Sequence, residues 1–436
     1  MASEELILKR TSINSVDTSK SGESQPLSTT QTAPHPSKRT GTWMGASLNI
    51  ICVSVGTGVL NLPSVINRSG WSGLGIMVLM AIIGVYVGNI FVQTMYIKPG
   101  KRLESFAFVT QEAFGRKGFW FSTAITVVYC LGTVCTWIII TGTQTTHLLG
   151  EAHKHLDQRA SMAIVAVCMW IPYVSLKEIR EITISSVFGV LTALATAIIV
   201  VCASFANRDS SAAHTGVAVG GLPTALASIS FMYAGAVVYP HIEGNMKHPK
   251  QWCVTLGLSN FVVCTIFCLV SGVGYWAFGS HTVSPVVDNL PHTTAVNAGI
   301  VLIILHVIFA APLMLVSATL EIEMALGITK EKMGTVREMA WRLVIRTLAI
   351  SGLLGISIAI PYFGETLDLI SSISTTVVFF LVPVACHIKL LGWRNAGLTK
   401  LVACGAIFLL GIVACGLGTF NAVKALVASV RNGSKG

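Results

Sequence analysis

The sequence predicts an all-α polytopic membrane protein with eleven transmembrane helices. Of its 436 residues, 53% are hydrophobic and only 11% are charged, and the mean hydropathy is +0.72. Such a chain is too apolar for a soluble domain and too long for a single membrane anchor. The apolar runs without charges lie at residues 43–66, 72–97, 119–149, 160–176, 182–206, 217–240, 252–278, 294–320, 347–363, 369–388 and 401–423.

The chain divides into a polar tail and one membrane domain. Residues 1–40 are rich in Ser and Thr and lack the apolar content of a core or of a secretory leader, so we expect a disordered cytoplasmic tail. Its hydroxyl groups either serve regulation or are simply solvated. Residues 41–430 form the expected transmembrane domain, whose connections are too short for a soluble catalytic domain. We therefore do not expect an enzyme, and the filter motifs or charge rings of a channel are also missing.

The distribution of positive charge predicts the orientation of the chain. With the N-terminus in the cytoplasm, 22 of the 29 Lys and Arg residues fall on the cytoplasmic side. This asymmetry places the N-terminus inside and, with an odd number of spans, the C-terminus outside or in an organelle lumen. It also accounts for the net charge of +10 without a nucleic-acid partner. The eleven cysteines lie in or beside the spans with no C-x-x-C pair, so no metal site and no cofactor is expected.

Two apolar spans contain residues that interrupt helices. The first holds "GVLNLP" at 58–63 and the sixth holds "GAVVYP" at 235–240, offset by 177 residues. Corresponding breaks predict two repeats of five spans, which are inverted because five is odd. Interrupted segments at matching places in two halves indicate a transporter site near the middle of the bilayer. Either segment alone would fit a simple kink or close helix packing.

Three longer stretches carry a family resemblance. "NIICVSVGTGVLNLPSVINRSGWSGLG", "FMYAGAVVYPHIEGNMKHPKQW" and "KPGKRLESFAFVTQEAFGRKG" resemble the amino acid/auxin permease family, most closely its vacuolar and vesicular amino acid transporters. The resemblance implies an eleven-span carrier whose first ten helices form a leucine-transporter-like 5+5 inverted repeat. It also implies secondary active transport of amino acids in a vacuolar or lysosomal-type membrane, with the plasma membrane as the alternative.

The two breaks supply groups for both charged ends of an amino acid. Free N–H groups near the first break suit the carboxylate, and free carbonyls near the second suit the ammonium. No charged residue lies in the cores of spans one, three, six or eight, which favours neutral amino acids. The predicted substrate-binding residues are Gly56, Thr57, Gly58, Phe231, Met232, Tyr233, Ala234 and Gly235, with Tyr129 from span three.

The driving ion is predicted from one histidine and from missing oxygen ligands. His306 is the only titratable histidine or acid deep in the eighth span, so it is the candidate for coupling, or else a neutral structural residue. Where the resemblance implies sodium-ligating side chains, this chain has Cys52, Ala310 and Ala311. A thiol or a methyl group is a poor ligand for a hard cation, so proton-linked transport is favoured over sodium. A sodium-coupled symporter and an amino acid sensor of the same fold are the alternatives.

Overall fold

The computed structural model describes residues 39–150, 157–175, 183–233, 235–326, 328, 333–392 and 397–433. Its α-helices are α2 (Trp43–Ser54), α3 (Leu62–Ser69), α4 (Ser72–Met95), α5 (Phe106–Gly150), α6 (Gln158–Ser175), α7 (Thr183–Ala206), α8 (Leu222–Tyr233), α9 (Tyr239–Asn245), α10 (Trp252–Phe278), α11 (Thr294–Leu326), α13 (Thr335–Ala359), α14 (Phe363–Ile370), α15 (Val382–Leu391) and α16 (Leu398–Gly433). The short 3₁₀ helices are η1 (Thr57–Asn61), η3 (Val219–Gly221), η4 (Gly235–Val237), η5 (Pro249–Gln251), η6 (Gly279–His281) and η7 (Val286–Asn289), and two π-helical turns, η8 (Ser371–Thr375) and η9 (Val377–Leu381), join α14 to α15.

The all-helical class is confirmed, because the described part of the chain holds only two isolated β-bridges and no strand. Eight helices there are long and apolar enough to cross a membrane, and α2 with α3, bent by 43°, makes one more. The shorter α6 and the pair α8 and α9 fall at the predicted fourth and sixth spans. Eleven spans remains a prediction that these shorter segments would complete. The predicted tail falls almost wholly on residues 1–38, outside the described residues.

Several helices extend beyond the apolar runs that predict them. The third predicted span begins at 119, whereas α5 begins at Phe106 and passes a kink at Gly115, where φ is +69°. The ninth was expected at 347–363, whereas α13 covers Thr335–Ala359. An apolar run marks only the part of a helix within the hydrocarbon, and helices continue into the polar layer. Pro361 explains the early end of α13, because a proline disfavours helical geometry in the residue before it.

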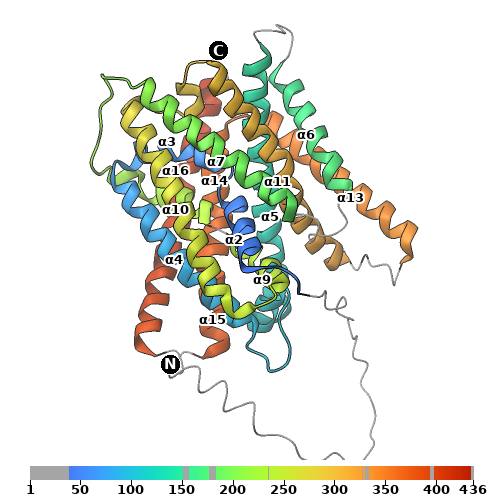
Figure 1. The fold of residues 1–436 in the computed structure, drawn as a ribbon. Helices are drawn as coiled ribbons and strands as arrows, with labels where there is room; N and C mark the ends of the chain where they lie inside the picture. The colour runs from blue at the N-terminus through green and yellow to red at the C-terminus, as the bar shows by residue number, and fades with distance from the viewer. Residues whose placement is uncertain are drawn as a thin grey trace, which may run out of the picture. The chain divides into compact units, whose positions relative to one another are not determined.

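The interrupted helices lie inside the bundle. α2 packs between α10 and α7, α8 packs against α4 and α16, and α11 packs against α5 and α7. Figure 1 shows α6 and α13 together at one edge, away from α4 and α10. Every residue of α8 from Thr224 to Tyr233 is buried. The two predicted breaks are therefore surrounded by other helices rather than exposed to lipid.

The predicted topology has a direct test. We expect a tag before residue 39 to be protected in sealed vesicles whose cytoplasmic face is inside, and a tag after residue 436 to be accessible to added protease. The reason is the excess of Lys and Arg on the side that shares the N-terminus. Tags at both ends that respond alike would contradict the odd number of spans.

Candidate functional site

The first span is broken where two glycines precede a proline. α2 ends at Ser54, and Val55 and Gly56 leave helical geometry, with Gly56 at φ −100° and ψ −158°. A 3₁₀ turn follows, and α3 resumes with Pro63 in its first turn. Glycine has low helix propensity, and a proline in a first turn loses no hydrogen bond because that N–H has no helical partner. The sequence thus both stops the first helix and starts the second.

The sixth span is broken in the same way. α8 ends at Tyr233, Gly235–Val237 forms a 3₁₀ turn, and α9 begins with Pro240 in its first turn. Ala234 falls outside the described residues. The interruption therefore lies at the segment that the sequence predicts.

The two breaks touch each other. A Cβ atom added to Gly58 would stand 2.1 Å from Cε and 2.4 Å from Sδ of Met232, and 3.9 Å from the ring of Phe231. Real Cβ atoms do not approach other atoms so closely, so the bare backbone of glycine is what admits the Met232 thioether at this point. Segments far apart in the sequence thus meet through a glycine and a flexible side chain.

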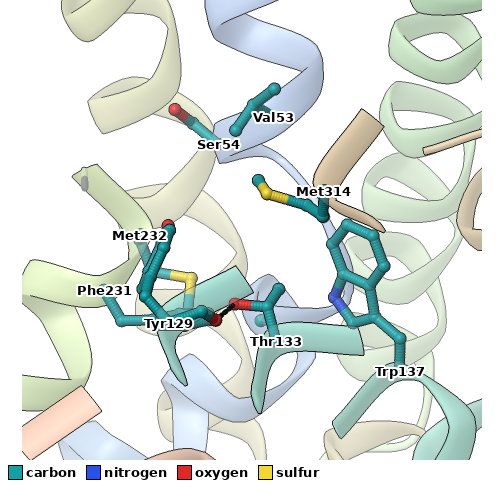
Figure 2. Close-up of a pocket in the computed structure, with 10 residues that line it drawn as sticks. Val53, Ser54, Tyr129, Thr133, Trp137, Phe231, Met232 and Met314 are labelled. Atoms are coloured by element: carbon teal, nitrogen blue, oxygen red, sulfur yellow. Dashed lines mark hydrogen bonds between the residues drawn. The ribbon is translucent and has the colours of Figure 1, made fainter. Parts of the chain in front are cut away.

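A small cavity opens where the breaks meet. Its volume is about 20 Å³, close to the space needed for one water molecule. Figure 2 shows Met232 of α8 and Met314 of α11 beside it, with Tyr129, Thr133 and Trp137 along α5. The lining residues are Val53, Ser54, Gly56, Gly58, Tyr129, Thr133, Trp137, Phe231, Met232 and Met314, none of which is charged. A larger ligand requires the two methionines to move, which their flexible side chains allow.

Five of the nine predicted substrate residues line this cavity, namely Gly56, Gly58, Tyr129, Phe231 and Met232. Thr57 is fully buried in η1, and its hydroxyl oxygen has no hydrogen-bond partner, but it does not line the space. Tyr233 instead packs on Phe267 of α10 with ring centroids 5.5 Å apart, and a Cβ at Gly235 would meet the ring of Tyr239. Helical residues advance about 100° each, so Phe231 and Met232 can both face the cavity while Tyr233, about 200° from Phe231, falls on the other side of α8.

Sequence reasoning missed Val53, Ser54, Thr133, Trp137 and Met314. Tyr129, Thr133 and Trp137 recur every fourth residue, which places them on one helix face. That spacing around the predicted Tyr129 was a signal that could have found the other two. Met314 had no such signal, because its place depends on how α11 packs against α5.

His306 lies beside the first break. Its side chain is fully buried in α11, and Nδ1 is 2.9 Å from the carbonyl oxygen of Gly189 in α7. Because a carbonyl only accepts, Nδ1 carries the hydrogen and Nε2 of the neutral ring is the acceptor. Nε2 has no hydrogen-bond partner and is 3.6 Å from the position of a Cβ on Gly56. The histidine does not line the cavity, but it contacts the backbone that does.

An ion pair lies on the predicted non-cytoplasmic side of the cavity. Arg68 at the end of α3 bonds Asp368 of α14, and Ser228 of α8 donates to the same carboxylate at 2.5 Å. Nearby, Ser284 donates to the side-chain oxygen of Asn61 at 2.5 Å. Asp368 thus joins α3 and α8, which belong to the two broken spans, to α14.

A second set of ion pairs, centred on Glu243, lies on the predicted cytoplasmic side of the cavity. The fully buried carboxylate of Glu243 in α9 pairs with Arg102 at 2.7 Å and with Arg39 at 3.8 Å. Gly41, just before α2, donates its N–H to the carbonyl of Asn245 at 2.8 Å and accepts from the N–H of Lys247 at 2.7 Å. The start of the first span is therefore bonded to the end of the sixth, and the cavity lies between two layers of charged contacts.

Comparison with known proteins agrees with this architecture. The chain is 25% identical over 408 residues to the amino acid transporter AVT1C of Arabidopsis thaliana, covering 91% of this chain and 72% of the relative. It is 24% identical to the vesicular inhibitory amino acid transporter of Xenopus tropicalis, covering 88% and 77%. A solved Na⁺-coupled sialic acid symporter shares the fold, with a TM-score of 0.60 at 10% identity over 89% of this chain and 90% of that one.

These relatives are membrane transporters rather than enzymes. The family model described as transmembrane amino acid transporter protein matches residues 39–424, which is nearly all of the membrane domain. The predicted family is thereby confirmed. The chain belongs to the transmembrane amino acid transporter family and carries amino acids across a membrane.

Proposed function

We propose that the chain is a secondary active transporter of neutral amino acids that works by alternating access around the two helix breaks. The observation that carries this proposal is the contact between Gly58 and Met232, which brings both breaks to one uncharged cavity. Layers of charged contacts lie on either side of that cavity, at Arg68 and at Glu243. Opening one layer at a time would expose the cavity to one side at a time.

The breaks provide complementary partners for a zwitterion. The N–H groups of Thr57 and Gly58 begin η1, where the first turn has no helical acceptors and the dipole is positive, so they suit the carboxylate. The carbonyls of Phe231 and Met232 end α8 and suit the ammonium, as does that of Ala234 in the predicted set. Tyr129 is the nearest phenol on the cavity wall.

The lining favours substrates without a charged side chain. A charged group moved from water into this space would need a partner of opposite sign, because burying an unpaired charge costs several kcal/mol or more. The ten lining residues contain none. Two methionines and three aromatic side chains instead offer an apolar, adaptable wall.

The proposed mechanism includes an inverted repeat, which the similarity of the two breaks supports. Both breaks have a glycine, four intervening residues and a proline in the first turn of the following helix. We assign eleven helices, ten of them in two inverted sets of five with the last appended. The likeness to the sialic acid symporter, whose fold it shares, favours this assignment.

The proposed coupling ion is the proton and the proposed site of action is an endomembrane. Cys52, Ala310 and Ala311 offer no side-chain oxygen for sodium, although a structural neighbour is Na⁺-coupled by its title. A vesicular relative favours an internal compartment of the vacuolar or lysosomal type over the plasma membrane.

Reconstitution tests the function and the ion together. In proteoliposomes given a panel of amino acids, we expect uptake of neutral substrates that follows an imposed pH gradient and does not change with a sodium gradient. The physical reason is the absence of side-chain oxygen ligands at Cys52 and Ala310. Uptake that follows sodium and ignores pH would identify the sodium-coupled alternative, and binding without flux would identify a sensor.

A further inference from the structure

Two helices present their negative ends to the cavity. Val55 donates its N–H to the carbonyl of Ile51, the last helical bond of α2, so the carbonyls of Val53 and Ser54 accept no further helical bond. α8 ends next to the same space at Tyr233. The C-terminal end of a helix carries a partial negative charge and favours cations. The cavity therefore offers a place for a cation beside the end of α2.

The ring of His306 lies next to the end of α2, and one of its two nitrogens, Nε2, has no hydrogen-bond partner. The Nδ1 hydrogen is fixed on the carbonyl of Gly189, so a proton can be added only at Nε2. Nε2 is buried, lacks a hydrogen-bond partner, and lies 3.6 Å from the Cβ position of Gly56. A Cβ on Gly189 would stand 2.6 Å from the sulfur of Cys52 and 3.5 Å from His306 Nδ1, so the ring lies against the last turn of α2.

We propose that His306 Nε2 is the proton-binding site of the carrier, and that its proton and the substrate ammonium exclude one another at the cavity where α2 and α8 end. This inference rests on the proposed transport function. Both cations lie near the one cavity where α2 and α8 end, and like charges repel strongly in a buried space. Proton and amino acid therefore occupy the protein alternately, which makes the transporter an exchanger.

The helix segments around His306 contain no other acidic or basic residue, so His306 is the proposed proton-binding group beside the first break. No Asp, Glu, Lys or Arg occurs in residues 43–61, 119–146, 183–206 or 294–319, the parts of α2, η1, α5, α7 and α11 that pack around it. The other titratable side chains in these ranges are Cys52, Tyr129, Cys130, Cys135 and Cys202, of which Cys52 lies close to the ring of His306 and Tyr129 lines the cavity.

Among the described residues, the ion pairs of α11 lie near its C-terminal end. Glu323 pairs there with Arg342 and Arg346 of α13, and Tyr173 of α6 bonds Thr319. Thr319 is thirteen residues beyond His306, or about 20 Å along a helix. Their charges are thus remote from the break.

Competition between the proton and the substrate predicts the direction of proton movement on substrate binding, and this direction can be measured. When the amino acid binds, the ammonium displaces the proton from Nε2, so purified protein should release protons into a weakly buffered solution. Lowering the pH should weaken apparent substrate affinity by up to about tenfold per pH unit where His306 titrates. Proton and substrate binding together would give the opposite sign for both.

The test compares two histidines in the full-length protein. His306→Gln removes the proposed site, and His387→Gln is the matched control. His387 is also buried, with Nδ1 3.1 Å from Thr94 and Nε2 without a partner, but it lies in α15 outside the cavity lining. The readouts are proton release on addition of a neutral amino acid at about pH 5 to 8, where histidine titrates, and labelled substrate exchange without a gradient.

We expect wild type and His387→Gln to release protons on substrate binding, and His306→Gln to exchange substrate without proton release. Wild-type protein that takes up protons, or releases none, would overturn the inference even if His306→Gln fails to fold. His306→Gln that still releases protons would also overturn it. Wild-type protein that neither binds nor exchanges any amino acid would refute the transport function, and the inference with it.

Discussion

Gly58→Val is expected to lower uptake about 5- to 150-fold at normal protein abundance. The added side chain would collide with Met232, whose Cε lies 2.1 Å from the Cβ position, and would fill the cavity at the carboxylate end. Overpacking of this kind costs about 1–3 kcal/mol, which corresponds to that range of affinities. The measurement is initial uptake in proteoliposomes, normalised to the amount of folded protein.

Two further variants separate the site from general packing. Gly75→Val in α4 is the matched control, because nothing lies within 4 Å of its Cβ position, and we expect normal uptake. Gly58→Ala combined with Met232→Ala removes the colliding thioether and should recover part of the uptake that Gly58→Ala loses. Normal uptake by Gly58→Val would show that the glycine is not next to the substrate.

Arg68→Gln is expected to destabilise the protein more than any other single change at the outer ion pair. The Asp368 side chain is only 1% exposed, so loss of its partner leaves a buried carboxylate bonded to Ser228 alone. Breaking a buried pair by removing one partner costs about 3–5 kcal/mol. The thermal unfolding midpoint of the purified protein in detergent reports this loss.

The double variant separates the effect of the ion pair on stability from its proposed effect on transport. Arg68→Gln with Asp368→Asn removes both charges and keeps a hydrogen-bond acceptor for Ser228, so the unfolding midpoint should return most of the way to wild type. Uptake should stay low, because the ion pair that joins α3 to α14 is still missing. Arg68→Gln as stable as wild type would contradict the burial of Asp368, and a double variant with full uptake would contradict its closing role.

The sequence was sufficient to predict an all-helical membrane protein and the two helix interruptions, because both depend on local chemistry. Apolar runs long enough to cross a bilayer mark the helices, and glycine followed by proline marks where a helix ends and the next begins. Residues next to the breaks, such as Gly58 and Met232, could therefore be named as candidates before the structure placed them beside the cavity. Boundaries such as the early start of α13 at Thr335 were not, because a helix continues past its apolar part.

Much of the site depends on packing that no local pattern reveals. Met314 reaches the cavity only because α11 packs on α5, and Tyr233 packs on Phe267 of α10 instead of lining the cavity. The closing pairs of Arg68 with Asp368 and of Arg102 with Glu243 join residues more than a hundred positions apart. The position of His306 beside Gly56 likewise follows from the fold rather than from its span.

The two hydrogen bonds of Gly41 connect the start of the first span to the end of α9. Because Gly41 is bonded to Asn245 and Lys247 through two backbone hydrogen bonds, a displacement of Gly41 would be passed on to the second part of the sixth span. Truncations that stop before Arg39 preserve both hydrogen bonds, and truncations that remove Gly41 eliminate them.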